Sequence, residues 1–435
     1  MSSSRGGLAG AFGKTLMTTV GITAISFISS VLTARMLGPE GRGLLSAALM
    51  VGTLAAGVAQ LGLATSYVYH VGAARRFSYG GLLSASVLMV ALVAAAMGWI
   101  GSQLRSDPQF VAALPWVIAL AAFMGTQNYF FLLAQIKSDL RFFNLMRFSL
   151  VGGNLLLLLP LLLFYHTVQF MQMLYCQLAV VVALTLVGAY WSMQNRVWNV
   201  AQPKEPVSLI RVLRYGLQQH GTVLLSLLLL NFDKIILLKR GQIAEYGYYA
   251  MAFTTSRLIG AVQEAVAVAL YARFAGRDLQ QLDDKVRTAF RLTFGPLLLL
   301  AALGATLSHW LIVLVYGEKF APMALPFAIL LFECVCGGAS WTLAQRFTAG
   351  GRPGLVLVRQ LISVVPVFIA MPFLPAGNVY VFLALLMLLG AVLRLVVTLC
   401  MYPITLKEKM PALLPTRADL QMLYGLLPRA RGSLN

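Results

Sequence analysis

Charged side chains lie inside several long apolar segments of the sequence, where a charge is costly. Arg257 and Glu264 are seven residues apart in the segment 247–271, with Gly260 and Ala261 between them. A charge at the centre of a bilayer costs roughly 2.5–3.5 kcal/mol, so it normally faces a partner or a water-filled cavity. Seven residues make about 10 Å of helical rise, which is too far for a direct ion pair. The two charges therefore predict either a polar strip that receives an anionic ligand or two separate contacts that hold neighbouring helices together.

The apolar segment 214–238 carries a second set of polar side chains. Asp233 is spaced so that it shares one helix face with earlier polar residues of the segment. Lys234 is the next residue, and its side chain points about 100° away from that of Asp233 around the helix. Asp233 is near the outer end of the segment. It therefore either takes part in ion or substrate coupling or is simply wetted from the membrane surface.

Two more charges, and three amides, lie in other apolar segments. Glu333 falls in 322–346 and Arg394 in 378–402, where they either line a cavity or pair with each other. The amides offer hydrogen-bonding groups suited to sugar hydroxyls, or else interhelical contacts worth about 0.6 kcal/mol each. They are Gln60, Gln127 and Asn128.

The composition indicates that most of the chain is surrounded by lipid. The 435 residues are 59% hydrophobic and only 11% charged, whereas soluble domains carry about 25% charged residues. The net charge of +19 is explained by basic residues in cytoplasmic loops. No basic run is long enough to follow a phosphate backbone, so nucleic acid is not an expected partner.

Twelve apolar runs are long enough to span a bilayer. They fall at 14–36, 44–69, 79–101, 110–134, 148–165, 170–191, 214–238, 247–271, 289–315, 322–346, 353–374 and 378–402. The sequence predicts an all-α transmembrane bundle of two six-helix lobes. The predicted parts are an N-terminal lobe, a cytoplasmic linker, a C-terminal lobe and a basic cytoplasmic tail, at 1–193, 194–213, 214–402 and 403–435.

Lysine and arginine are distributed unequally between alternate loops. Within spans lie Lys234, Arg257 and Arg394, and most of the others fall on one side, including Arg359 in the loop that precedes the eleventh span. The opposite side has only Arg35, Arg42, Arg105, Lys239, Arg240 and Lys319. Because basic residues are retained in the cytoplasm, both termini are predicted to be cytoplasmic.

The two halves of the chain contain similar segments. Residues 35–43 align with 239–247, which pairs Gly43 with Gly247. A second match pairs 110–135 with 320–345. Six helices in each half give the repeats one orientation, which predicts a pseudo-twofold axis along the membrane normal with the substrate path between the lobes.

A series of short landmarks runs through the chain in order: Arg35–Gly43, Leu61–Leu63, Asn231–Leu237, Tyr246–Ala250, Tyr316–Phe320 and Ala349–Arg352. In these landmarks the chain resembles the bacterial polysaccharide and O-antigen flippases (Wzx-type) of the multidrug/oligosaccharidyl-lipid/polysaccharide exporter superfamily. The resemblance implies a twelve-helix bundle with a central cationic cavity and alternating access. It also implies transfer of an undecaprenyl-diphosphate-linked oligosaccharide from the cytoplasmic to the periplasmic leaflet of the bacterial inner membrane, for surface polysaccharides such as O-antigen or exopolysaccharide.

Such a transporter would use the charges and amides inside the spans. Those predicted to bind substrate are Arg257, Lys234, Arg394, Gln60, Gln127 and Asn128. Those predicted to couple an ion are Asp233, Glu264 and Glu333. The implied partners are the lipid-linked glycan, the bilayer, and a polysaccharide polymerase with its chain-length machinery. The sequence has no nucleotide-binding or hydrolase motif and no grouped metal ligands, so no catalytic residue, cofactor or metal is expected.

Two alternatives stay open. A multidrug cation antiporter of the same superfamily would be favoured by several carboxylates in the cavity and little arginine, which is the reverse of what the spans carry. A membrane polymerase or ligase acting on lipid-linked sugars would need a large outer loop for its chemistry, and the longest outer loops here have about ten residues.

Overall fold

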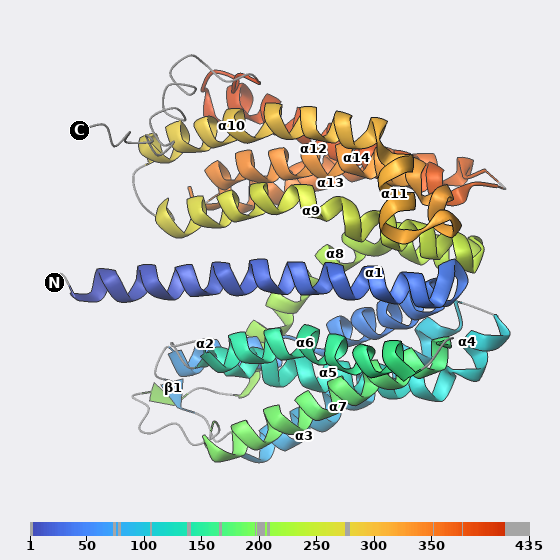
Figure 1. The fold of residues 1–435 in the computed structure, drawn as a ribbon. Helices are drawn as coiled ribbons and strands as arrows, with labels where there is room; N and C mark the ends of the chain where they lie inside the picture. The colour runs from blue at the N-terminus through green and yellow to red at the C-terminus, as the bar shows by residue number, and fades with distance from the viewer. Residues whose placement is uncertain are drawn as a thin grey trace, which may run out of the picture. The chain divides into compact units, whose positions relative to one another are not determined.

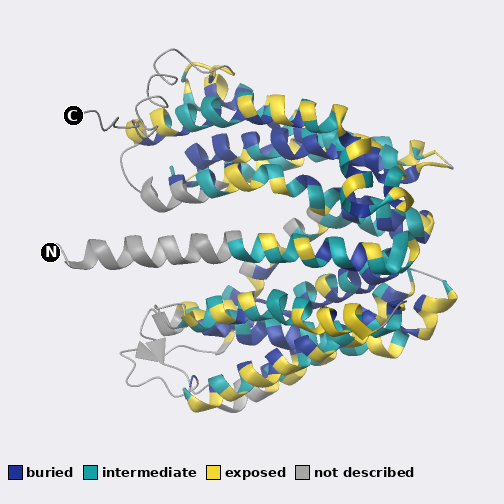
Figure 2. Ribbon diagram, in the orientation of Figure 1, coloured by how far each residue is buried: buried dark blue, intermediate teal, exposed yellow. Residues whose placement is uncertain are grey.

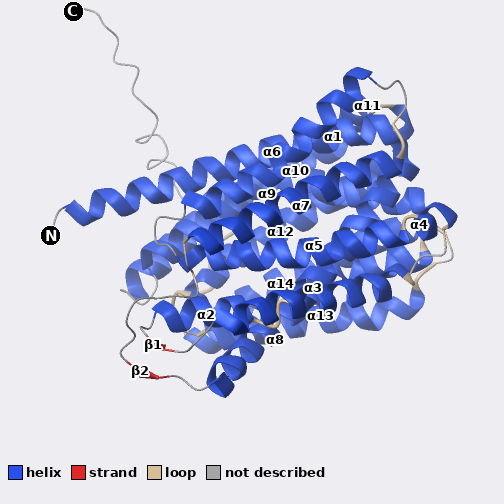
Figure 3. Ribbon diagram, turned by 90° about the horizontal axis from the view of Figure 1, so that it is seen from below, coloured by secondary structure: helices blue, strands red, loops and turns tan. Residues whose placement is uncertain are grey.

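A computed structural model of the chain describes residues 3–72, 75–76, 80–104, 107–136, 141–164, 168–195, 197, 205–206, 209–274, 279–350, 352–375 and 377–413. Nearly all of this described chain is helical (Figure 3). It divides into two compact units, residues 1–250 and 251–435.

The first unit contains eight helices in its described part and the beginning of a ninth. They are α1 (Ser3–Ala59), α2 (Leu63–Gly72), α3 (Gly80–Ser102), α4 (Pro108–Ala112), α5 (Leu114–Leu133), α6 (Arg141–Phe164), α7 (Phe170–Gln194), α8 (Leu209–Arg240) and α9 (Ile243–Phe274). Helix α5 lies at the centre of this unit, because α1, α3 and α7 all pack against it.

The second unit contains the rest of α9 and five further helices. They are α10 (Leu279–Thr306), α11 (Ser308–Tyr316), α12 (Ala324–Thr348), α13 (Pro353–Ala370) and α14 (Val379–Met401), with short turns η2 (Glu318–Met323), η3 (Met371–Phe373) and η4 (Tyr402–Leu406). The long helices run side by side (Figure 1), with α12 packed against both α10 and α14. Helix α13 packs against α14 and α12.

Helix α1 consists of two arms that meet at a kink. Gly38 has a positive φ of 67°, a conformation that glycine adopts without steric cost, and Pro39 follows it. The second arm ends at another break, where Leu61 and Gly62 both have positive φ and the chain restarts as α2. The predicted span 44–69 is therefore interrupted near its end by a backbone turn that hydropathy alone does not reveal.

The helices confirm the predicted fold class. Within the described residues, nine helices are long and apolar enough to cross a membrane. Counting the two arms of α1 separately and adding α8 and α9 gives twelve. Helix α8 carries Asp233 and Lys234, and α9 carries Arg257 and Glu264, so these two helices hold most of the charges that the sequence places inside spans.

Many large apolar residues are exposed, and Figure 2 marks the exposed positions along the helices in yellow. Leu163 and Phe164 on α6 are 79% and 80% exposed, and Leu299 on α10 is 75% exposed. Apolar faces this extensive are stable only against hydrocarbon, since water would favour their burial. The exposed helix faces therefore fit the lipid-facing surface of a membrane protein.

Helix α8 packs against α1 and α2 within the first unit. Ser66 on α2 donates a hydrogen bond to the carbonyl of Val212 on α8 at 2.7 Å. A two-residue strand β1 (Arg75–Arg76) also pairs in parallel with β2 (Glu205–Pro206). The pairing brings together two loops that were both assigned to the cytoplasmic side, while the division into six-helix lobes at 194–213 stays a prediction.

The glycines that the sequence repeat aligns lie against each other in the structure. A Cβ atom added to Gly43 would lie 2.1 Å from the carbonyl oxygen of Ile243, and one added to Gly247 would lie 2.3 Å from that of Pro39. The second arm of α1 and the beginning of α9 thus approach backbone to backbone. Small residues permit this close approach between membrane helices.

Replacing Gly43 with alanine is expected to destabilise the protein by about 1–3 kcal/mol, because the methyl group must push the two backbones apart. The measurement is the melting temperature of the purified protein in detergent. Gly221→Ala is the matched control, since no atom lies within 4 Å of its added Cβ. Equal melting temperatures for the two variants would contradict the tight contact.

Candidate functional site

Three arginines and one glutamate from four helices meet inside the second unit, and we call them the arginine cluster. Its members are Arg257 on α9, Glu333 on α12, Arg359 on α13 and Arg394 on α14. One carboxylate oxygen of Glu333 lies 2.6 Å from Arg257. The other lies 4.0 Å from Arg394. Glu333 therefore bridges two guanidinium groups that are far apart in the sequence.

Small residues bring α9 close enough to α12 for the first of these contacts. A Cβ added to Gly260 would lie 2.5 Å from the sulfur of Cys334. One turn further along α12, Gly338 leaves room for Gln263, which donates a hydrogen bond to the carbonyl of Val335 at 3.2 Å. This packing places Arg257 beside Glu333, one residue before Cys334.

Arg359 is held by hydroxyl and carbonyl groups rather than by a carboxylate. It donates hydrogen bonds to the carbonyl and hydroxyl oxygens of Ser340 at 2.8 and 2.6 Å, and to the hydroxyl of Thr398 at 3.2 Å. Gln360, the next residue on α13, accepts a hydrogen bond from Arg394 at 3.5 Å. The positive charges of Arg359 and Arg394 repel each other.

Arg359 does not lie in a cytoplasmic loop, contrary to the prediction from the distribution of basic residues. It is only 2% exposed. Helix α13 begins at Pro353, so Arg359 is six residues, about 9 Å, into the span. Without Arg359, the predicted cytoplasmic loops still contain far more lysine and arginine residues than the loops on the opposite side.

The charges of the arginine cluster do not balance. It contains three guanidinium groups, and among the described residues its ionic contacts are with the single carboxylate of Glu333. The Nε atoms of Arg359 and Arg394 are buried and have no hydrogen-bond partner in the described structure. Two positive charges thus lack a counter-ion in an environment where unpaired charge is costly.

Arg257 is the most accessible member of the cluster. Its side chain is 36% exposed, against 19% for Arg394 and 3% for Glu333. Its guanidinium group lies over the ring of Phe253, 4.1 Å from the ring centroid. A guanidinium held by an aromatic face, one carboxylate oxygen and the side chain of Cys334 retains donors for a further anion.

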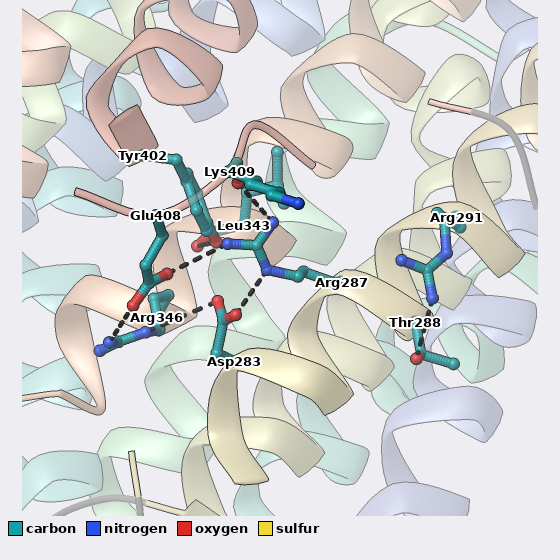
Figure 4. Close-up of polar contacts among 9 residues, drawn as sticks. All are labelled: Asp283, Arg287, Thr288, Arg291, Leu343, Arg346, Tyr402, Glu408 and Lys409. Carbon is teal, nitrogen blue, oxygen red and sulfur yellow. Dashed lines mark hydrogen bonds and ion pairs between the residues drawn. The ribbon is translucent and has the colours of Figure 1, made fainter. Parts of the chain in front are cut away.

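A second charged cluster, at the end of α14, has balanced charges and serves as a contrast. Glu408 contacts Arg287 at 3.1 Å and Arg346 at 2.8 Å, and Asp283 also pairs with both arginines (Figure 4). Burial would raise the pKa of Glu408, but the hydrogen bond and charge of Arg346, followed by those of Arg287, lower it below its ordinary value. Two acids against two arginines need no ligand, so this cluster is an anchor for the segment after α14.

Another buried carboxylate lies in the first unit. Asp233 is fully buried and accepts a hydrogen bond from the hydroxyl of Tyr249 at 2.5 Å. The ammonium of Lys234 lies 3.4 Å from its other oxygen, because the long lysine side chain reaches back toward its neighbour. The alternative that Asp233 is wetted from the membrane surface is therefore wrong, since the side chain is enclosed.

A family model described as polysaccharide biosynthesis protein matches residues 32–325, well over half of the 435-residue chain. The chain belongs to this family. A sequence comparison with curated proteins finds no match.

Solved structures similar to this chain include transporters and a flippase. An inward-facing multidrug resistance MATE family transporter of the MOP superfamily has a TM-score of 0.65 at 15% identity, over 88% of this chain and 96% of the other. The MATE transporter VcmN of Vibrio cholerae has a TM-score of 0.59 at 16% identity, over 93% and 98% of the two chains. The lipid II flippase MurJ, in an inward closed conformation, has a TM-score of 0.70 at 10% identity, over 94% and 89%.

Identities this low show a shared fold. The chain is an all-α transmembrane protein that shares the fold of these structures, which confirms the predicted fold class, and the matching family model supports the polysaccharide part of the stated resemblance.

The structure separates the predicted site residues into two groups. In the second unit it brings together Arg257, Glu333 and Arg394, and their roles as ligand and ion contacts stay predictions. Glu264 lies on α9 as predicted, but its side chain is exposed and it is not part of the arginine cluster. Lys234 is engaged with Asp233 in the first unit.

The three amides belong to the first unit. Gln60 donates a hydrogen bond to the carbonyl of Gly125 on α5 at 2.9 Å, which is the interhelical contact that the sequence left open. Gln127 is buried and Asn128 half-buried, both on α5. Among the described residues no group of three or more His, Cys, Asp or Glu side chains could hold a metal ion.

Sequence reasoning missed the residues that support the charges. Arg359 lay inside a predicted span but was counted with the loop before it. Ser340 and Thr398, which bind it, look like ordinary small residues of apolar helices. Tyr249 belongs to a quoted landmark, yet nothing in the sequence indicated that its hydroxyl reaches Asp233.

Proposed function

We propose that this protein moves an undecaprenyl-diphosphate-linked oligosaccharide from the cytoplasmic to the periplasmic leaflet of the bacterial inner membrane by alternating access. The observation that carries the proposal is the excess positive charge of the arginine cluster. Three guanidinium groups face one carboxylate inside a membrane protein.

The chemistry of the head group fits that excess. A diphosphate diester carries about two negative charges at neutral pH, which would compensate the two positive charges that Glu333 leaves unpaired. Guanidinium groups match phosphate oxygens with two parallel hydrogen bonds, and such charge-assisted bonds are about twice as strong as neutral ones. Arg257, as the exposed member, would make the first contact.

The polyprenyl tail and the sugars of the substrate would contact other parts of the protein. The polyprenyl tail is compatible with the apolar faces that α6 and α10 expose, and so can stay in lipid while the head group passes. Gln127 and Asn128 are proposed contacts for sugar hydroxyls, whereas Gln60 is already used between helices. A polymerase with its chain-length machinery is the proposed partner on the periplasmic side, with both termini of this chain cytoplasmic.

The buried carboxylate of Asp233 supports ion coupling as part of the same function. Its oxygens contact the hydroxyl of Tyr249 and the ammonium of Lys234, so a coupling ion would have to displace one of these two groups. A multidrug cation antiporter is the weaker proposal, because positive charge predominates in the arginine cluster and would repel a cationic drug.

Deletion of the gene followed by analysis of the lipid-linked oligosaccharides tests the proposed function. The expected result is loss of a surface polysaccharide and accumulation of its undecaprenyl-diphosphate-linked unit on the cytoplasmic leaflet. Restoring the intact gene should reverse both effects. Cells that become drug-sensitive while keeping all surface polysaccharides would instead support the antiporter.

A further inference from the structure

Glu333 contacts the arginines of the cluster unequally. The contact with Arg257 is 2.6 Å and the one with Arg394 is 4.0 Å. Glu333 is almost completely buried, whereas Arg257 is one-third exposed. The strongest internal ion pair of the cluster therefore involves its most accessible arginine.

A carboxylate and a phosphate use the same donors of a guanidinium group. Both bind through oxygen atoms that accept N–H donors in the plane of the fork. An anion that approaches Arg257 must therefore share its donors with Glu333 or displace it. Gly337 leaves space beside the carboxylate, since a Cβ at that position would lie 3.8 Å from Glu333 and 3.7 Å from Arg394.

We propose that Glu333 is an internal counter-ion that competes with the diphosphate for Arg257 and so sets how quickly the head group is released. This inference rests on the proposed function. Without ligand, Glu333 compensates one arginine. When a diphosphate binds, its oxygens take the donors of Arg257 and the carboxylate moves toward Arg394. Return of Glu333 to Arg257 then favours dissociation, which a transporter needs as much as binding.

The isosteric substitution Glu333→Gln tests the inference by removing the charge and keeping the shape. The purified full-length protein in detergent is titrated with farnesyl diphosphate, a soluble prenyl diphosphate probe, and the dissociation rate is measured by rapid dilution. We expect at least tenfold tighter binding and a correspondingly slower dissociation than for the native protein. Equal or weaker binding by a folded variant would overturn the inference.

Two further variants show whether an effect is specific to the carboxylate of Glu333. Glu318→Gln removes an exposed carboxylate of the same unit, on η2, and should leave binding unchanged. Glu333→Asp keeps the charge but shortens the side chain, so it should also tighten binding, although less than Glu333→Gln does. If the glutamine variant does not fold, the aspartate variant decides the question, and unchanged binding by it overturns the inference.

Binding of the probe by Arg257→Gln shows whether the proposed function or only this inference has failed. If Arg257→Gln binds the probe as well as the native protein does, the cluster is not a diphosphate site and both ideas fail. If Arg257→Gln loses binding while Glu333→Gln gains none, the site stands and only the competition by Glu333 is rejected.

Discussion

Replacing Arg257 with glutamine is expected to lower the translocation rate of the lipid-linked oligosaccharide by about 10- to 100-fold. A hydrogen bond to a charged group contributes about 1.5–3 kcal/mol, and about 1.4 kcal/mol corresponds to a factor of ten. The substitution also leaves the buried carboxylate of Glu333 with only its 4.0 Å contact to Arg394. The rate is measured in reconstituted vesicles with the lipid that the deletion strain accumulates.

Two comparisons show whether the loss is specific to the site. Arg240→Gln removes the same charge from an exposed position at the end of α8 and should translocate normally. Arg257→Lys keeps the charge but loses the planar fork, so its rate should fall between those of the native protein and the glutamine variant. Equal losses in Arg240→Gln and Arg257→Gln would show that net charge matters and the cluster does not.

The balance of charge within a cluster distinguishes a ligand site from a structural anchor in this molecule. Both clusters contain arginines in contact with acids, and both are largely buried. The anchor at Glu408 has as many acids as arginines and ties the end of α14 to α10 and α12. The arginine cluster has a surplus of arginine, which is the property that an anionic substrate would use.

Periodicity and composition were enough to predict the helices and the class of protein, because the bilayer imposes a fixed length of apolar sequence. They also identified Arg257, Glu333 and Arg394 as unusual, since a charge inside an apolar run stands out without any structure. The sequence repeat aligns Gly43 with Gly247, and in the structure these two glycines lie in one close contact between helices.

The partners of those charges could not be predicted, because they come from distant parts of the chain. Sequence spacing suggested a strip formed by Arg257 and Glu264 on one helix face. The observed partner of Arg257 is Glu333 on another helix, and the contact depends on how α9 packs against α12 through Gly260. Arg359 was misplaced for a related reason, since a count by loops does not show how far a residue near a span end lies inside the bundle.

An inside-negative potential of 100 mV is expected to shift the distribution of the lipid-linked oligosaccharide toward the outer leaflet by about three orders of magnitude. One charge crossing the full potential contributes about 2.3 kcal/mol per 100 mV, so two negative charges contribute about 4.6 kcal/mol. The measurement uses vesicles in which a potassium gradient and valinomycin set the potential. The same vesicles without a gradient, and with a pH gradient alone, are the controls.

The size of this shift depends on whether the arginine cluster stays in place while the head group moves. Arg257 and Arg394 belong to α9 and α14, and contacts with Glu333, Phe253 and Gln360 hold their side chains in place. If the arginines move only slightly along the membrane normal, the two phosphate charges alone cross the field and the full shift appears. If they moved outward with the head group, their positive charge would cancel most of the effect. A distribution that ignores the potential but follows the pH gradient would contradict potential-driven export and would point to Asp233 as the coupling group.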